Sequence, residues 1–312
     1  MKKVLCLGLT PALQRTLVFE GLEIDEVNRA RQVVESAAGK ALNTARALVT
    51  LGTPAQTAGF NGGQTGRKIA GYLKAYGVES ALTPMQAGTR ICSTLIVAAS
   101  GTVTELVEEA REPGRAAVAR FVRDNLKRTR AAAMLVISGT LPPYAGDDFY
   151  VGFVRAAAEA DVPVVIDSQK EALVNVLFER PLLAKLTVRE LAATLREPMT
   201  SEKSILRGMR DLQAMGAQNV FVTHGAKPAY LVTPKRGWRF APPPVARHVN
   251  PIGSGDCTTA GIVHAVLTGK PLREAVRYGL ACGSANVESL TPADLDLKRV
   301  AVLRRGVGCE AL

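Results

Sequence analysis

The stretch NPIGSGDCTTAG, residues 250–261, combines two glycines, a serine and a carboxylate directly before an apolar helical pattern. A glycine-rich turn at a helix start offers unpaired backbone N–H groups and the positive end of the helix dipole, which together attract anions. Asp256 is then placed either to take a proton beside a bound anion or to cap its own helix. Taken alone, GSGD favours the cap. The helix is expected over about 256–268, after a strand-like stretch at 246–249.

A lysine and an asparagine share the start of another expected helix. In ESAAGKALNTARAL, Lys40 follows Gly39 and lies three residues before Asn43, so both side chains can face the same way. An ammonium and an amide in that arrangement suit a hydroxyl or phosphate ligand. The ordinary beginning of a helix explains the pattern equally well, so both interpretations remain open.

Two further stretches join expected strands to turns. ISGTLPP (137–143) is a strand that runs into a tight turn, and ligands collect at the carboxyl ends of strands in open α/β sheets. A plain strand–helix connection is the equal alternative. KLTVREL (185–191) places Thr187 and Glu190 one helical turn apart, where they could reach magnesium or phosphate through water. On its own, that pair is better explained as a surface helix turn.

These candidate sites lie in a regular alternation of strands and helices. Short apolar runs rich in β-branched residues predict the strands, and helical periodicity predicts the segments between them. The alternation predicts a parallel sheet with helices on both faces. The expected strands are 4–9, 54–60, 132–137, 162–167 and 219–225, and the expected helices are 42–52, 66–77, 115–129, 147–160 and 202–216.

Two segments break this alternation. Residues 12–35 and 90–108 alternate apolar and polar residues with a period of two, and the second contains a Ser100–Gly101 turn typical of a hairpin. They predict a small sheet that stands off the core, either as a lid over a site or as an edge decoration. A third hairpin is expected over 229–240.

Composition narrows the functional classes. The chain has 312 residues, of which 47% are hydrophobic, enough for a large packed core. Its net charge of +11 is spread along the whole length, which favours a solvated basic surface; attraction for a nucleotide or sugar phosphate is the sharper alternative. Aromatic residues make up only 5%, and no nucleic-acid-binding motif accompanies the charge, so nucleic acid is not an expected partner.

The five cysteines are odd in number and form no CxxC motif, which predicts reduced, mostly buried thiols rather than disulfides or a zinc site. The apolar run near the N-terminus stops at Pro11, too short for a secretion signal. No uninterrupted apolar stretch reaches the roughly 18 residues of a membrane span. We therefore expect a cytoplasmic protein without a membrane partner.

The order of these motifs resembles the PfkB (ribokinase-like) family of carbohydrate kinases along essentially the whole chain. NPIGSGDCTTAG is similar to the family's C-terminal signature, usually written DTxGAGD. The branch that holds 1-phosphofructokinase and tagatose-6-phosphate kinase is the most similar, on the stretches LTPALQRTL, VNRA, AGKALNTARAL, TRICSTLI, REPG and SGTLPP. The resemblance implies a single kinase domain over 1–312, with a ribokinase-like three-layer α/β/α core, a mostly parallel sheet and a β-lid built from about 12–35 and 90–108.

The resemblance also implies residue roles. Asp256 would be the general base, and the backbone of Gly253, Ser254 and Gly255 would form the anion hole for the γ-phosphate. ATP and Mg²⁺ would be the cofactors, with Glu190 reaching the metal through water. The substrate-binding counterparts are Gln14, Gly39, Lys40, Asn43, Arg90 and Ser138, and the nucleotide-binding counterparts are Lys185, Glu190, Thr223, Gly225 and Asn286.

Four positions depart from the family's motifs. Gln14 stands where the family has an aspartate that holds sugar hydroxyls, and Ala38 replaces a glycine of GGKGxN. Thr187 replaces the asparagine of KPNxxE, and Pro228 replaces the second glycine of TxGxxG, which removes a backbone donor. The intact GSGD implies that phosphoryl transfer is retained, whereas the missing aspartate leaves the identity of the sugar open.

The expected function is ATP-dependent phosphorylation of a sugar phosphate, either fructose 1-phosphate at O6 or tagatose 6-phosphate at O1. A same-fold kinase of a free sugar or nucleoside and a non-catalytic sugar-phosphate sensor are the alternatives. Exposed lid edges favour a homodimer formed through the lid. A Rossmann dehydrogenase is disfavoured because no GxGxxG follows the first strand.

Overall fold

The apolar strands assemble into a ten-stranded sheet in the computed structural model, which describes residues 2–312. The strand order is β14-β13-β12-β11-β10-β9-β8-β1-β4-β5, parallel from β5 to β11 and antiparallel from β11 to β14. The predicted parallel sheet is therefore confirmed. The strands are β1 (Val4–Leu7), β4 (Ala55–Asn61), β5 (Glu79–Pro84), β8 (Met134–Ser138), β9 (Val164–Asp167), β10 (Leu183–Thr187), β11 (Val220–His224), β12 (Lys227–Val232), β13 (Gly237–Ala241) and β14 (Gly308–Ala311).

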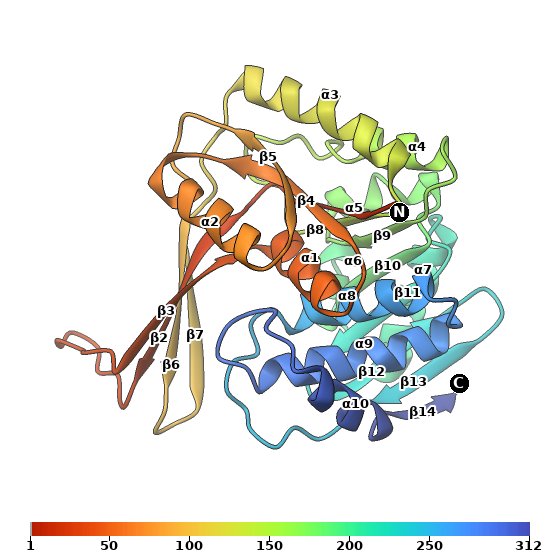
Figure 1. Cartoon of the computed structure of the whole chain (residues 1–312). Helices are drawn as coiled ribbons and strands as arrows, with labels where there is room; N and C mark the ends of the chain where they lie inside the picture. The colour runs from red at the N-terminus through yellow and green to blue at the C-terminus, as the bar shows by residue number, and fades with distance from the viewer. Residues whose placement is uncertain (1) are drawn as a thin grey trace.

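Helices cover both faces of this sheet, as the alternation predicts. One apolar core joins the sheet to α1 (Lys40–Thr50), α2 (Gly63–Ala75), α8 (Ser254–Leu267), α9 (Leu272–Val287) and α10 (Leu297–Arg305). The other joins it to α3 (Arg115–Ala131), α4 (Val151–Ala158), α5 (Glu171–Val174), α6 (Val188–Leu195) and α7 (Glu202–Ala214). Figure 1 shows α1 beside α8 and α9 over one face of the sheet. The three layers fix the carboxyl ends of the strands relative to the starts of α1 and α8.

A second sheet stands away from the core, with strand order β3-β2-β6-β7. Its strands are β2 (Ala12–Phe19), β3 (Gln32–Ala38), β6 (Ile91–Val97) and β7 (Thr102–Val107). The two central strands, β2 and β6, are parallel, and each is flanked by an antiparallel neighbour. Figure 1 shows this sheet projecting from the body as a separate blade. We call it the lid; it arises from the two segments with period-two alternation.

Several local expectations differ from the structure. The stretch 246–249 is not a strand but part of the connection that leads to α8. The hairpin predicted over 229–240 exists as β12 and β13, and it extends the main sheet. The strands β5 and β14 were not predicted, because their short polar sequences, ESALTP and GCEA, have little apolar character. Edge strands need less burial than central ones, so their sequences carry a weaker signal.

The cysteines and the helices bear on two further expectations, reduced thiols and the lack of a membrane span. Among the described residues the five cysteines are free, with Cys309 exposed and the other four buried. No helix within residues 2–312 combines the length and apolar character that a membrane crossing requires.

Candidate active site

A cleft of about 450 Å³ opens between the lid and the carboxyl ends of β8 and β10. Ligands collect at this edge in open α/β sheets because the starts of the following helices point there. The lid lines one wall of the cleft, so it covers a site rather than decorating an edge. Polar residues from the lid are Gln14, Arg90 and Glu105, and those from the body include Lys40, Asn43, Lys185, Glu190 and Asp256.

Asp256 lies in the first turn of α8 and faces α1 instead of its own helix. Its Oδ2 accepts a hydrogen bond from Nδ2 of Asn43 at 2.7 Å, and no side chain caps α8, whose N-cap is Gly253. The interpretation of Asp256 as a helix cap is therefore wrong. The carboxylate is only 5% exposed. Burial, followed by the negative charge of Asp167, raises the pKa of Asp256 to about 7, against the opposing effects of Lys40 and Asn43.

The loop before Asp256 presents backbone amides to the cleft. The N–H of Ser254 donates to the carbonyl of Pro251 at 3.1 Å, so this amide is engaged in a turn. Within the described residues, the N–H groups of Gly253 and Gly255 have no backbone acceptor. Gly253 has a left-handed φ of 85°, and a Cβ on Gly255 would lie 2.9 Å from Nζ of Lys185. The glycines thus let two donors and an ammonium approach one anion.

Asp167, at the end of β9, organises the charges beneath this loop, and it is absent from the sequence-based predictions. Its Oδ2 binds Nζ of Lys185 at 2.8 Å and accepts from Oγ1 of Thr259 at 3.1 Å, and its Oδ1 lies 3.2 Å from Nζ of Lys40. Burial alone would raise the pKa of Asp167, but Lys185 and Lys40 outweigh it and lower the pKa to about 2. A signal was available, because a carboxylate that ends a predicted parallel strand lies where ligands bind.

Lys40 connects this cluster to the start of α6. Its Nζ lies 3.2 Å from Oε1 of Glu190 as well as 3.2 Å from Asp167. Burial lowers the pKa of Lys40, but the surrounding carboxylates, Asp167 first, outweigh burial and raise the pKa overall. Lys40 therefore carries its positive charge at every relevant pH.

The pair predicted one helical turn apart in KLTVREL forms a capping box. Oγ1 of Thr187 accepts from the N–H of Glu190 at 3.1 Å, and Oε2 of Glu190 accepts from the N–H of Thr187 at 2.7 Å. Both residues also line the cleft, so the pair is more than a surface turn. Within the part of the chain that the structure describes, no three His, Cys, Asp or Glu side chains gather into a metal site of their own.

The lid contributes two of the predicted substrate residues. Gln14 is 2% exposed, and its Nε2 donates to Oγ1 of Thr94 at 2.8 Å, which leaves Oε1 as an acceptor. Arg90 donates to the carbonyls of Glu108 at 2.9 Å and Thr10 at 3.0 Å, and its buried Nε has no partner among residues 2–312. Glu105, which the sequence analysis did not single out, lies beside them and adds a carboxylate to this wall.

Two other predicted residues act through the backbone or lie behind the cleft wall. Gly39 has a φ of 111°, and a Cβ there would lie 2.9 Å from the carbonyl oxygen of Thr10, so only glycine fits at the start of α1. Ser138 is buried at the end of β8, where its Oγ has no partner among the residues that the structure describes, and the following residues, Gly139 and Thr140, line the cleft.

Three predicted nucleotide residues lie beyond the cleft. Thr223 and Gly225 line a neighbouring cavity of about 520 Å³, which meets the cleft at Thr187. Asn286 is fully buried: its Nδ2 donates to the carbonyl of Ile252 at 2.8 Å and to Oγ of Ser254 at 3.1 Å. Asn286 thus holds the loop at the start of α8 and has no free surface for a ligand.

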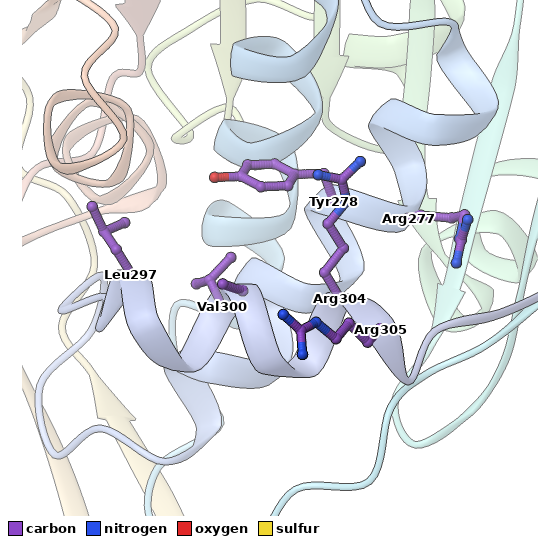
Figure 2. Close-up of a pocket in the computed structure, with 7 residues that line it drawn as sticks. Arg277, Tyr278, Leu297, Val300, Arg304 and Arg305 are labelled. Atoms are coloured by element: carbon purple, nitrogen blue, oxygen red, sulfur yellow. The ribbon is translucent and has the colours of Figure 1, made fainter.

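A separate groove between α9 and α10 offers positive charge without a proton acceptor. Its polar side chains are Arg277, Tyr278, Arg304 and Arg305, and the guanidinium of Arg304 lies 5.5 Å from the centroid of the Tyr278 ring (Figure 2). None of the described residues that line this groove is a carboxylate. The chemistry therefore belongs to the cleft under the lid.

Comparison with known proteins shows the family of the chain. A family model described as pfkB family carbohydrate kinase matches residues 1–297. Phosphofructokinase-2 from Escherichia coli, in complex with potassium, is 25% identical, with a TM-score of 0.89 over 98% of this chain and 99% of that one.

Two more distant structures show the fold alone. A "possible 1-phosphofructokinase" from Thermotoga maritima has a TM-score of 0.91 at 22% identity, over 99% of both chains. Ribokinase from Arabidopsis thaliana, complexed with ribose and ATP, has a TM-score of 0.78 at 19% identity, over 97% of this chain and 99% of that one. The ribokinase-like core that the motifs predict is confirmed.

Proposed function

Because the chain belongs to the pfkB family of carbohydrate kinases, we propose that it transfers the γ-phosphoryl group of ATP to a hydroxyl of a sugar phosphate, fructose 1-phosphate or tagatose 6-phosphate. The observation that carries the proposal is the pairing of Asp256, whose pKa is raised to about 7, with the free N–H groups of Gly253 and Gly255. A proton acceptor and an anion site lie one residue apart. Phosphoryl transfer needs both.

Asp256 acts as the general base in this mechanism. As the sugar hydroxyl attacks the γ-phosphorus, its proton would pass to the carboxylate, the bond from that phosphorus to the bridging oxygen would break, and ADP would leave. A base with a pKa near neutrality suits this task. Asn43 holds the carboxylate at 2.7 Å and fixes which oxygen faces the substrate. Most of the rate enhancement comes from alignment and charge neutralisation, as is general for phosphoryl transfer.

The anion hole and the lysines neutralise the transferred group. The N–H groups of Gly253 and Gly255 donate to its oxygens, and the start of the 14-residue α8 adds the positive end of its dipole. Lys185 is fixed by Asp167 directly beside Gly255, so its ammonium can reach a phosphate without moving. Asp167 keeps the buried ammonium of Lys185 and the partly buried ammonium of Lys40 in place and is a positioning residue.

The nucleotide is assigned to the neighbouring cavity, with the phosphates directed into the cleft at Thr187. Thr223 and Gly225 line the nucleotide side. Magnesium binds proteins through one or two carboxylates, with phosphates and waters as the remaining ligands, and Glu190 at the junction fits that pattern. Glu190 would hold this metal through water, and the metal would supply positive charge that offsets the charge of the phosphates.

The substrate is assigned to the lid side of the cleft, next to Gly39 and the buried Ser138. Arg90 retains donors beyond the two that hold it in place, including its buried Nε, and a guanidinium suits a phosphate. Gln14 and Glu105 offer acceptors for sugar hydroxyls. One end of this wall therefore suits a phosphate and the other suits hydroxyls, which favours a phosphorylated sugar as the substrate.

The lid is also the proposed dimer interface. Its described segments expose large apolar side chains, among them Ile24, Val27, Val33, Leu106 and Val107. Exposed apolar residues concentrated on one small sheet mark a surface that associates. We therefore propose a homodimer formed lid to lid, with no nucleic acid or membrane partner.

Two departures from the family's motifs favour a second candidate, a non-catalytic sugar-phosphate sensor. Gln14 is neutral where the family has a carboxylate, and Pro228 lacks a donor beside the nucleotide cavity. A kinase of a free sugar or nucleoside is the third candidate, and Arg90 argues against it.

One experiment separates these candidates. Purified protein is assayed for ATP consumption with fructose 1-phosphate, tagatose 6-phosphate, fructose, tagatose, ribose and adenosine. The proposal predicts turnover with at least one phosphosugar and far less with the unphosphorylated compounds. Turnover of only a free sugar or nucleoside would support the third candidate. Binding of a phosphosugar without ATP consumption would support the sensor and overturn the kinase assignment.

A further inference from the structure

We infer that Arg46 is a positioning residue that holds the anion-hole loop of α8 from behind. Arg46 lies on α1, the helix whose Lys40 and Asn43 line the cleft. Its kinetic consequence rests on the proposed function, while its structural consequence can be measured without turnover. A chain of contacts runs from Arg46 to the loop that carries the amides of Gly253 and Gly255.

The first contact joins Arg46 to the segment before α10. Nη1 donates to the carbonyl of Pro292 at 2.9 Å, and Nη2 lies 3.0 Å from Oδ1 of Asp294. The guanidinium also lies 4.1 Å from the centroid of the Tyr76 ring, which follows α2. The Arg46 side chain is only 11% exposed, so these interactions are largely removed from solvent. A planar guanidinium can make all three at once, which a lysine cannot.

The second contact joins that segment to the loop. Pro292 packs so closely on Gly253 that a Cβ on Gly253 would lie 2.9 Å from Cβ of Pro292. The next residue, Ala293, is fully buried and has a φ of 60°, a left-handed conformation that costs free energy in a non-glycine residue. A strained, buried turn of this kind persists only when its surroundings hold it. Arg46 binds the residues on both sides of it.

The third contact returns to the anion hole through Asn286. The N–H of Ala293 donates to Oδ1 of Asn286 at 2.8 Å, and Nδ2 of Asn286 donates to the carbonyl of Ile252 and to Oγ of Ser254. The buried side-chain amide of Asn286 therefore supports the loop whose backbone amides face the cleft. Asn286 is itself held by the turn that Arg46 fixes. Helix α1 thus sets the base through Asn43 and the anion hole through Arg46. One rigid element fixes the distance between them.

The test compares Arg46→Ala with Arg304→Ala. Arg304 also stacks on a tyrosine but lies in the separate groove between α9 and α10, so it is a matched control (Figure 2). In Arg46→Ala, kcat should fall roughly 10- to 100-fold, as expected for a displaced catalytic group, while KM for the sugar changes less than about threefold. The acid limb of the pH profile should stay in place because Asn43 and Asp167 are intact. Arg46→Lys should recover part of the loss.

Hydrogen exchange gives the readout that is independent of activity. Amide exchange over residues 250–257 and 290–295 should accelerate in Arg46→Ala and remain unchanged in Arg304→Ala. Asp294→Ala, at a mostly exposed side chain, removes one contact and should show a smaller effect of the same kind if Arg46→Ala does not fold. Unchanged exchange and a kcat within threefold of the wild type would overturn the inference. So would a shifted acid limb, which would mean that Arg46 acts on the charge of Asp256.

An inactive wild-type protein would not by itself overturn the inference about Arg46. If the wild type consumes no ATP with any sugar, the proposed function fails. The exchange experiment still decides whether Arg46 holds the loop.

Discussion

The two walls of the cleft differ in how they treat charge. On the body wall, the side chains of Asp167 and Lys185 are 1% and 3% exposed, and each charge is held by a partner on another strand or helix. On the lid wall, Gln14 is buried, but the side chains of Glu105 and Val107 on β7 are exposed. The body wall is a network of charges that hold one another, whereas the part of the lid wall on β7 is open.

The two walls are therefore suited to different roles. Stabilising a transition state requires groups that do not reorganise during the reaction, which buried and fully paired charges provide. Selecting a substrate and associating with another chain require accessible side chains. We therefore expect substitutions in the body wall to affect kcat and stability, and substitutions in the lid to affect KM and association.

The largest effect is expected from Asp256→Asn. The amide keeps the size of the side chain but cannot accept the proton, so kcat should fall roughly 10²- to 10⁴-fold while ATP affinity stays close to that of the wild type. Steady-state kinetics and ATP titration measure the two quantities. Asp296, which accepts hydrogen bonds from the first turn of α10, is the matched control: Asp296→Asn should leave kcat unchanged. A loss of less than tenfold in Asp256→Asn would remove Asp256 from the role of base.

Asp167→Asn should reduce both stability and the pKa of the base. Removing one partner of a buried ion pair costs about 3–5 kcal/mol of unfolding free energy. Because the charge of Asp167 raises the pKa of Asp256, its loss should move the acid limb of the kcat profile to lower pH. Urea unfolding and a pH–rate profile test both effects. An acid limb that moves to higher pH would contradict the assigned coupling.

An exposed pair supplies the control for this variant. Arg130 and Glu159 are joined at 3.1 Å with side chains 50% and 56% exposed. Surface pairs contribute little, so Glu159→Gln should change the unfolding free energy by less than about 1 kcal/mol and leave the pH profile unmoved.

The sequence predicted which strands and residues form the body wall better than it predicted the contacts between those residues. The strands 132–137 and 162–167 are recognisable because parallel strands covered on both faces require continuous apolar runs. Lys40, Asn43 and Asp256 were recognisable from glycine-rich helix starts. The partner of Asp256 was not, because Asn43 lies 213 residues away and only the packing of α1 on α8 joins them. Local patterns carry no information about such pairings.

Other misses have the same origin. The position of Asp167 at the end of the strand VVID was a usable signal, but its two lysine partners lie on different elements and could not be found from the sequence. Asn286 lies in α9, where no local sequence pattern distinguishes a ligand-binding residue from a buried structural residue. The lid strands were predictable from their period-two alternation, but the sequence could not decide whether they face a cleft. That depends on the orientation of the whole sheet.

Arg90→Ala tests the lid wall. If Arg90 binds the substrate phosphate, KM for the phosphosugar should rise roughly 10- to 100-fold, the equivalent of about 1.5–3 kcal/mol for charged hydrogen bonds. KM for the corresponding free sugar should change far less. Arg90→Lys keeps the charge but loses the planar fork, so its KM should lie between that of the wild type and that of Arg90→Ala. Equal changes for phosphorylated and free sugars would indicate that Arg90 acts on the shape of the lid.

The smallest effect on chemistry is expected from Leu106→Glu on the outer part of the lid. Leu106 is 53% exposed and lies between Glu105 and Val107, so a carboxylate there is tolerated in the monomer. In a lid-to-lid dimer the same carboxylate would lose its water, and the dissociation constant should rise at least about tenfold. Val302→Glu, at a 55% exposed position on α10, is the matched control and should leave association unchanged. Sedimentation at several concentrations measures both. A dimer that Leu106→Glu leaves intact would place the interface elsewhere, and the exposed lid wall would then serve substrate selection alone.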